Sequence, residues 1–172
     1  MTFLFPPHPT SVIPVQDSDH AFPVHRIYCV GQNYSDHVKE MGGDPRENPP
    51  VFFSKPSDAG VIGNQPVTYP PATSDLHYEV ELVVALASGG SDIDVEEALA
   101  RVFGYAVGID FTRRDLQAEA KKQGRPWDAA KGFDQSAPTS AIRSTNGGDH
   151  PLEGRISLSV NGETRQDAKL SD

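Results

Sequence analysis

The sequence predicts a β-rich α+β protein whose helices are short. In residues 78–87 every even position is apolar, which is the period-two pattern of a strand. Asn161-Gly162 stands between two strand-like runs and is the signal of a type I′ hairpin turn. The helical patterns between such runs are short, and 172 residues suffice for one domain with its own core.

The composition indicates an acidic protein of ordinary polarity. Its formal net charge is −9 and its sequence pI is near 5.0, which argues against a nucleic-acid partner, because phosphate binding requires a basic surface. No apolar stretch approaches the roughly 18 residues of a membrane span, so we expect no membrane partner. A single cysteine, Cys29, leaves no internal disulfide to form, and the start of the chain lacks a signal-peptide pattern. We therefore expect a cytoplasmic protein with a buried structural thiol.

The first part of the chain is predicted to hold an extended arm with one edge strand, two further strands and one helix. Residues 1–25 contain several prolines and little periodicity, so we expect an extended N-terminal arm with one short edge strand. Residues 26–30 read as a buried strand, and the short helix that follows ends at Gly42-Gly43. Residues 51–53 read as the next strand, and residues 56–71 as a turn-rich connection.

The odd-numbered face of residues 78–87 differs from the even-numbered one. It starts with charge and continues with small or apolar side chains, in the order His77, Glu79, Glu81, Val83, Ala85 and Ala87. One end of the strand is therefore acidic and the other is packed. Downstream we expect helices at residues 94–103 and 113–123, the second capped by Thr112, a strand at 105–109, and a hairpin of strands 155–160 and 163–167.

Three carboxylates form the first candidate site. Glu79 and Glu81 are two apart on the predicted strand, so both leave the same face, with Cα atoms roughly 7 Å apart. Such a pair favours a hard cation such as magnesium, manganese or calcium between the carboxylates, and a solvent-facing strand end is the alternative. Asp110 follows the strand at residues 105–109, where it is either a third ligand or the cap of the next helix.

Two pairs with helical spacing are further candidates. His37 and Glu40 are three apart, so the carboxylate can orient the imidazole as a base that activates water, and an exposed surface pair is the alternative. Arg114 and Gln117 are also three apart and suit a carboxylate or a keto oxygen, unless they belong to a solvated face. Both pairs thus point to chemistry on a small polar substrate.

Two lysines stand apart from the charged runs. Lys131 lies in Ala129-Ala130-Lys131-Gly132-Phe133, where small and apolar neighbours are typical of a functional lysine or of one packed along its stem. Lys55, in Phe53-Ser54-Lys55-Pro56, has the same two interpretations. For both lysines, the local sequence is compatible with a functional role and with packing along the stem.

Taken in order, several segments resemble the fumarylacetoacetate hydrolase family. The matching segments are residues 28–34 with 37–41, 53–56, 77–82, 108–117, 125–127 with 130–133, and 160–163 with 165–166. They cover nearly everything after residue 25, and their order is more specific than any one motif. The chain start and residues 22–31 most resemble fumarylpyruvate hydrolases within that family.

The resemblance implies a mixed β-roll with short peripheral helices, a homodimer, and a catalytic domain at residues 26–172. The implied roles are magnesium or manganese ligation by Glu79, Glu81 and Asp110, water activation by His37 and Glu40, charge stabilisation by Lys131, and substrate contact by Arg114, Gln117 and Lys55. Family members continue beyond the position of Asp172 with a helix and strands that close the roll. We therefore expect this chain to lack the C-terminal part of that domain.

Three functional hypotheses follow. The first is metal-dependent hydrolysis of a carbon–carbon bond in an acylpyruvate, with fumarylpyruvate giving fumarate and pyruvate. The second is decarboxylation or isomerisation of a β-keto acid of the oxaloacetate type, which uses the same metal but no attacking water. The third is a truncated, inactive chain that binds a metal or a dicarboxylate.

Overall fold

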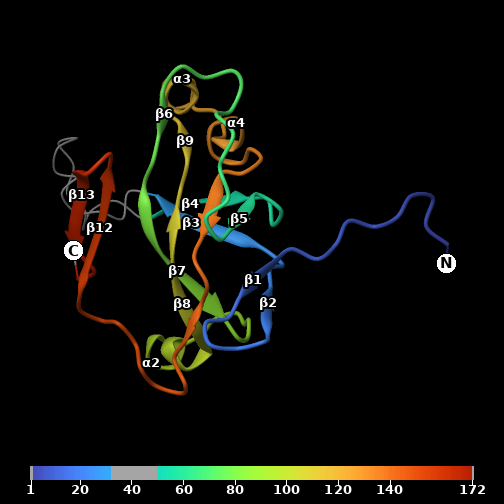
Figure 1. Cartoon of the computed structure of the whole chain (residues 1–172), viewed down its shortest axis with the longest axis vertical. Helices are drawn as coiled ribbons and strands as arrows, with labels where there is room; N and C mark the ends of the chain where they lie inside the picture. Colours follow the sequence, from blue (N-terminus) through green and yellow to red (C-terminus); the bar gives the residue numbers. More distant parts are fainter. Residues whose placement is uncertain (1, 32–49, 172) are drawn as a thin grey trace.

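Strand β8 (Val102–Ile109) is the centre of a five-stranded mixed sheet. β7 (Val80–Leu86) pairs antiparallel with one edge of β8, while β10 (Ala137–Thr139) and β11 (Arg143–Ser144) pair antiparallel with the other. β5 (Gly60–Ile62) extends the sheet parallel to β10 (Figure 1). The mixture of parallel and antiparallel pairs and the few short helices confirm the predicted β-rich α+β class.

The computed structural model describes residues 2–31 and 50–171. Within them the predicted strand at residues 78–87 begins only at Val80, as β7, and residues 78 and 79 form a break between β7 and a preceding two-residue strand, β6 (Leu76–His77). The packed end of the odd-numbered face is confirmed, because Ala85 lies in a core cluster with Ala106 and Ile142. On the even-numbered face, Val84 and Leu86 are 46% and 56% exposed. The fully apolar face is thus the more open one at this end of the strand.

Of the two helices predicted after residue 90, the first is shorter than expected and the second agrees with the prediction at its C-terminal end. The pattern at residues 94–103 yields only α2 (Val95–Ala98) and a single 3-10 turn, because β8 begins at Val102. α3 (Arg114–Gln123) ends at Gly124 in the left-handed conformation, with φ of 63°, as the sequence predicts. Arg113, and not Thr112, occupies its N-cap. A further helix, α4 (Asp128–Lys131), was not predicted, and none of the helices described is long and apolar enough to cross a membrane.

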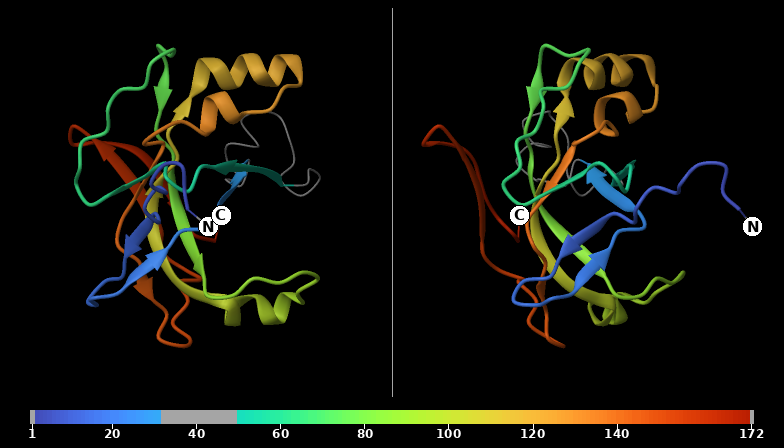
Figure 2. Two further views of the ribbon diagram at one scale, coloured as in Figure 1. Left: turned by 90° about the vertical axis from the view of Figure 1, so that its right-hand side faces the viewer. Right: turned by 45° about the vertical axis from the view of Figure 1, so that its right-hand side comes forward.

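The N-terminal segment contributes a hairpin where a single edge strand was expected. β1 (Val12–Pro14) and β2 (Ala21–Pro23) pair antiparallel. Phe22 stacks on Phe103 with ring centroids 5.6 Å apart, and the Ile142 amide donates to the Pro14 carbonyl at 2.8 Å. The hairpin therefore covers the apolar core at the end of the sheet that carries α2, while α3 and α4 lie at the opposite end (Figure 2).

Two further antiparallel pairs lie outside the central sheet. β3 (Ile27–Gly31) pairs with β4 (Val51–Lys55), which confirms both predicted strands. The predicted burial of β3 is wrong, because Tyr28 and Val30 are 69% and 42% exposed and Cys29 is only half-buried. β12 (Arg155–Val160) and β13 (Glu163–Lys169) form the predicted hairpin. Positive φ values of 52° and 83° at Asn161 and Gly162 match the two central positions of a type I′ turn.

Candidate active site

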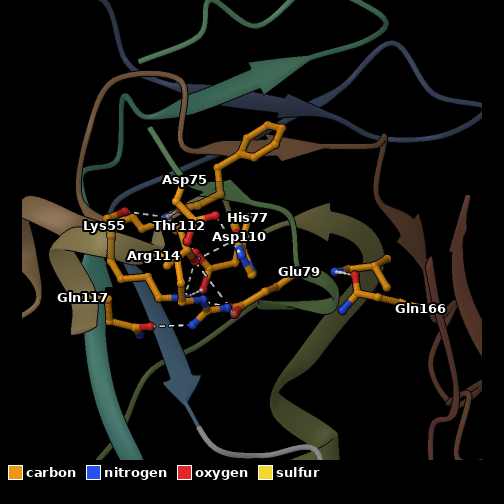
Figure 3. Close-up of polar contacts among 12 residues, drawn as sticks. Lys55, Asp75, His77, Glu79, Asp110, Thr112, Arg114, Gln117 and Gln166 are labelled. Carbon is orange, nitrogen blue, oxygen red and sulfur yellow. Dashed lines mark hydrogen bonds and ion pairs between the residues drawn. The ribbon is translucent and has the colours of Figure 1, made fainter. Parts of the chain in front are cut away.

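The polar residues of the site gather where β6 and β7 meet β8 and β9 (Thr112–Arg113). Asp110 follows β8, and its amide donates to the Glu79 carbonyl at 2.8 Å across the break between β6 and β7. β6 then pairs with β9, so the two chains stay side by side beyond the break. This pairing brings the Glu79 and Asp110 side chains to the same place (Figure 3).

The Lys131 ammonium lies at the centre of the site. It donates to Glu79 Oε2 at 2.7 Å, to Asp110 Oδ2 at 2.6 Å and to Thr112 Oγ1 at 2.6 Å. The Lys131 side chain is 3% exposed, and its Nζ lies 4.9 Å from the centroid of the Phe53 ring. A charge buried this deeply requires such partners, so Lys131 belongs to the polar site and is not a surface lysine.

Lys55, at the end of β4, approaches Asp110 from the other side. Its Nζ lies 2.8 Å from Asp110 Oδ1 and also donates to the carbonyls of Phe111, at 3.1 Å, and Lys131. Burial lowers the pKa of Lys55, and the Asp110 carboxylate opposes that shift. Although Lys55 is an ion partner of Asp110 Oδ1, this oxygen accepts no well-directed hydrogen bond from the residues that the structure describes.

Arg114 and Gln117 face the cluster from the first turns of α3. The Arg114 guanidinium donates to Glu79 Oε1 and to the Gln117 side-chain oxygen (Figure 3). Burial alone would raise the pKa of Glu79, but Lys131 and Arg114 outweigh burial and hold that pKa below its usual value. Glu79 is therefore ionised and shared between two cations.

Glu81, on β7, adds a third carboxylate to this end of the sheet. Burial raises the pKa of Glu81 to about 7, and the nearby charges of Glu79 and Asp110 act in the same direction. The donors fit a hard divalent cation, because all three are carboxylates and the charge of Glu81 is poorly compensated by the protein. In residues 2–31 and 50–171 no three ligand-type side chains form a ready-made metal cage, and the Lys131 ammonium lies between Glu79 and Asp110.

The structure brings together most of the predicted site. Direct contacts join Lys55, Glu79, Asp110, Arg114, Gln117 and Lys131, and Glu81 is coupled to them by charge. His37 and Glu40 lie outside the described residues. Thr112 was missed as a site residue, because it was interpreted as a helix cap. Its place two residues after Asp110 was the available signal, since alternate residues of an extended chain share a face.

A comparison with protein-family models identifies the family of the chain. The family model of the fumarylacetoacetate hydrolase C-terminal domain matches residues 26–172. The chain belongs to the fumarylacetoacetate hydrolase family. The family match includes β3 and every element after it, and therefore every residue of the polar cluster.

Solved and curated members of the fumarylacetoacetate hydrolase family resemble the chain closely. A fumarylpyruvate hydrolase from Pseudomonas aeruginosa, crystallised with Mn2+ and pyruvate, has a TM-score of 0.94 and 46% identity over 98% of this chain and 74% of its own. The mitochondrial oxaloacetate tautomerase of Mus musculus is 46% identical over 84% of this chain. Oxaloacetate tautomerase YcgM of Escherichia coli (strain K12) is 40% identical over 88%. The chain spans 65% and 69% of the lengths of these two curated relatives.

Proposed function

We propose that this chain carries the catalytic residues of a metal-dependent hydrolase that cleaves a carbon–carbon bond in an acylpyruvate, with fumarylpyruvate as the substrate. The supporting observation is the contact of one buried lysine with two carboxylates, Glu79 and Asp110, beside the Arg114–Gln117 pair. The likeness to the Pseudomonas aeruginosa fumarylpyruvate hydrolase extends over 98% of the chain, which favours this substrate.

The proposed ligands of a magnesium or manganese ion are Glu79, Glu81 and Asp110. Their oxygen-only donor set supports a hard cation, and the ion would supply Lewis acidity toward the oxygens of a 1,3-dicarbonyl group. The P. aeruginosa relative was crystallised with Mn2+, which supports the same class of ion for this chain.

The remaining residues have roles in substrate binding and proton transfer. Arg114 and Gln117 bind the carboxylate or keto oxygen of the pyruvoyl end, and Lys131 stabilises the negative charge of the departing pyruvate enolate. His37, oriented by Glu40, takes a proton from a water whose oxygen attacks the distal carbonyl carbon. The carbon–carbon bond then breaks, the acyl part leaves as a carboxylic acid, and the pyruvate carbon accepts the proton.

The test of this proposal is pyruvate release from fumarylpyruvate in the presence of Mn2+ or Mg2+, with and without a chelator. We expect release that stops when the metal is removed and resumes when it is restored. Glu79→Ala should abolish metal binding and turnover, while the exposed control Glu153→Ala should change neither. Metal affinity and turnover that survive Glu79→Ala would contradict the assignment.

A second candidate function is tautomerisation or decarboxylation of oxaloacetate. This candidate is supported by similarity to the two curated relatives described above, which are oxaloacetate tautomerases and are 46% and 40% identical to this chain. This reaction needs enolate stabilisation by Lys131 but no attacking water. With oxaloacetate as substrate, a change in enol absorbance reports tautomerisation and carbon dioxide release reports decarboxylation. Neither signal reports hydrolysis.

An inactive chain that binds a metal or a dicarboxylate is the third candidate, and metal-dependent turnover of either substrate would eliminate it. A homodimer and a cytoplasmic location stay predictions from the sequence. Sedimentation velocity measures the first, and localisation of a tagged chain measures the second.

A further inference from the structure

The hydroxyl of Thr112 accepts a hydrogen bond from Lys131, although Thr112 is neither a proposed metal ligand nor a proposed substrate contact. We propose that Thr112 is a positioning residue that fixes the Lys131 ammonium for the reaction. This inference rests on the proposed function. Thr112 is fully buried in β9, where residue 112 pairs with His77 of β6.

The partners of Lys131 divide into two kinds. An ammonium has three N–H donors, and here they point to Glu79, Asp110 and Thr112. Glu79 and Asp110 are proposed metal ligands, so their oxygens are shared with the ion. Among the described partners of the Lys131 ammonium, the Thr112 oxygen is therefore the one whose hydrogen bond does not depend on the metal.

The surroundings of Thr112 orient its hydroxyl as an acceptor toward Lys131. Its oxygen lies 3.3 Å from the Asp110 carbonyl and 3.5 Å from Glu79 Oε2, and both of these oxygens can accept its proton. Because an ammonium cannot accept, a lone pair of Thr112 Oγ1 faces Lys131 Nζ. A β-branched side chain has few χ1 rotamers, and burial holds Thr112 in one of them. The hydroxyl is thus a fixed acceptor that holds the Lys131 ammonium in position.

The experiment compares Thr112→Val, Thr112→Ser and Thr145→Val. Valine has the shape of threonine without the hydroxyl, and serine restores the hydroxyl. Thr145 is the matched control, because it is also buried and its hydroxyl lies 3.4 Å from a main-chain carbonyl, that of Phe103, outside the site. The readouts are kcat and KM for fumarylpyruvate at saturating Mn2+, Mn2+ affinity by calorimetry, and melting temperature.

We expect Thr112→Val to lower kcat about 10- to 100-fold, which is the effect of losing one hydrogen bond to a charged group. KM and Mn2+ affinity should stay within about threefold, since the hydroxyl is not a proposed metal ligand. Thr112→Ser should recover most of kcat, and Thr145→Val should retain all of it. An unchanged kcat in Thr112→Val, or a loss of kcat that serine fails to restore, would overturn the proposal.

A second readout does not depend on turnover. In protein with 15N-labelled lysine, the buried ammonium groups of Lys131 and Lys55 give Nζ signals that Lys131→Met and Lys55→Met assign. We expect Thr112→Val to broaden or shift the Lys131 signal and to leave that of Lys55 in place. If the chain releases no pyruvate, the proposed function fails, and an unperturbed Lys131 signal separately refutes the role of Thr112.

Discussion

The two ends of the β7–β8 ladder are stabilised by opposite kinds of interaction. At one end Ala85, Ala106 and Ile142 form an apolar core, against which Phe22 and Phe103 pack. At the other end buried cations and carboxylates contact one another around Lys131. Both ends adjoin the same pair of strands, since Glu79 immediately precedes β7 and Asp110 immediately follows β8, so strand pairing alone does not determine which chemistry an end contains.

The difference lies in what each end requires of its side chains. An apolar core needs the correct volume and tolerates exchange among hydrophobic residues. A buried charged cluster needs each charge opposite its partner, and replacing one member leaves another without compensation. Substitutions in the apolar end should therefore affect stability, and those in the charged end should affect chemistry.

Lys131→Met is the strongest way to break the charged end. We expect kcat to fall by about 10²- to 10³-fold, because methionine is similar in length but cannot stabilise an enolate. Arg114 still pairs with Glu79 and Lys55 with Asp110, so circular dichroism should show a folded chain. Lys122→Met, an exposed change on α3, is the control for initial-rate measurements. A kcat within threefold of that of the unaltered chain would show that Lys131 does not stabilise the enolate.

Ile142→Ala is the corresponding change in the apolar end. Ile142 is fully buried, and its truncation should lower the free energy of unfolding by about 2–5 kcal/mol, as measured by urea titration. Ile142→Val should cost only about 0.5–1.5 kcal/mol. The kcat of the folded fraction should be unchanged in both. A large loss of kcat would show that the two ends are coupled.

Cys29, on β3, reports on the charged end without altering it. Burial, with a smaller contribution from Asp110, raises the pKa of Cys29 from 9.0 to about 11, against the opposing effect of Lys55 and Lys131. At pH 8 the thiolate is then about 100-fold less abundant, so alkylation by iodoacetamide should be about 100-fold slower than in the urea-unfolded chain. Equal rates in the two states would contradict the raised pKa of this half-buried thiol.

The pH dependence of metal binding tests Glu81. Its pKa is raised from 4.5 to about 7, so Glu81 is largely protonated at pH 6 and must release a proton to bind a cation. The Mn2+ affinity should be about tenfold higher at pH 8 than at pH 6. In the metal-free protein the same shift lowers stability as pH rises from 4.5 toward 7, because the folded state retains a proton that the unfolded chain has released. Calorimetry with a flat affinity across this range would remove Glu81 from the ligand set.

The sequence predicted those parts of the site that depend on neighbouring strands. Glu79 and Asp110 were found because each stands beside a strongly apolar strand, and β7 and β8 pair directly. The Arg114–Gln117 pair was found because helical spacing predicts such contacts. Their chemical roles stay predictions, as do those of His37 and Glu40.

Features that depend on tertiary contacts were not predictable in this way. α4 spans Asp128–Lys131 and is too short to produce a periodic pattern, so the burial of Lys131 against Glu79 was not visible. Thr112 was predicted to cap a helix, but pairing with β6 holds it in an extended conformation and turns its hydroxyl to Lys131. The hairpin β1–β2 was missed because prolines obscure the pattern of short strands.

The long sequence separations inside the charged cluster bear on how the protein folds. Lys131 contacts a residue 52 positions earlier, and Lys55 donates to a main-chain oxygen 76 positions later. Such contacts form only after long loops have closed, and each closure costs entropy before the contact exists. The hairpins β1–β2 and β12–β13 close over short loops and can form early. We therefore expect the charged groups to stay hydrated through most of the folding reaction and the site to assemble late, after the short-loop hairpins have formed.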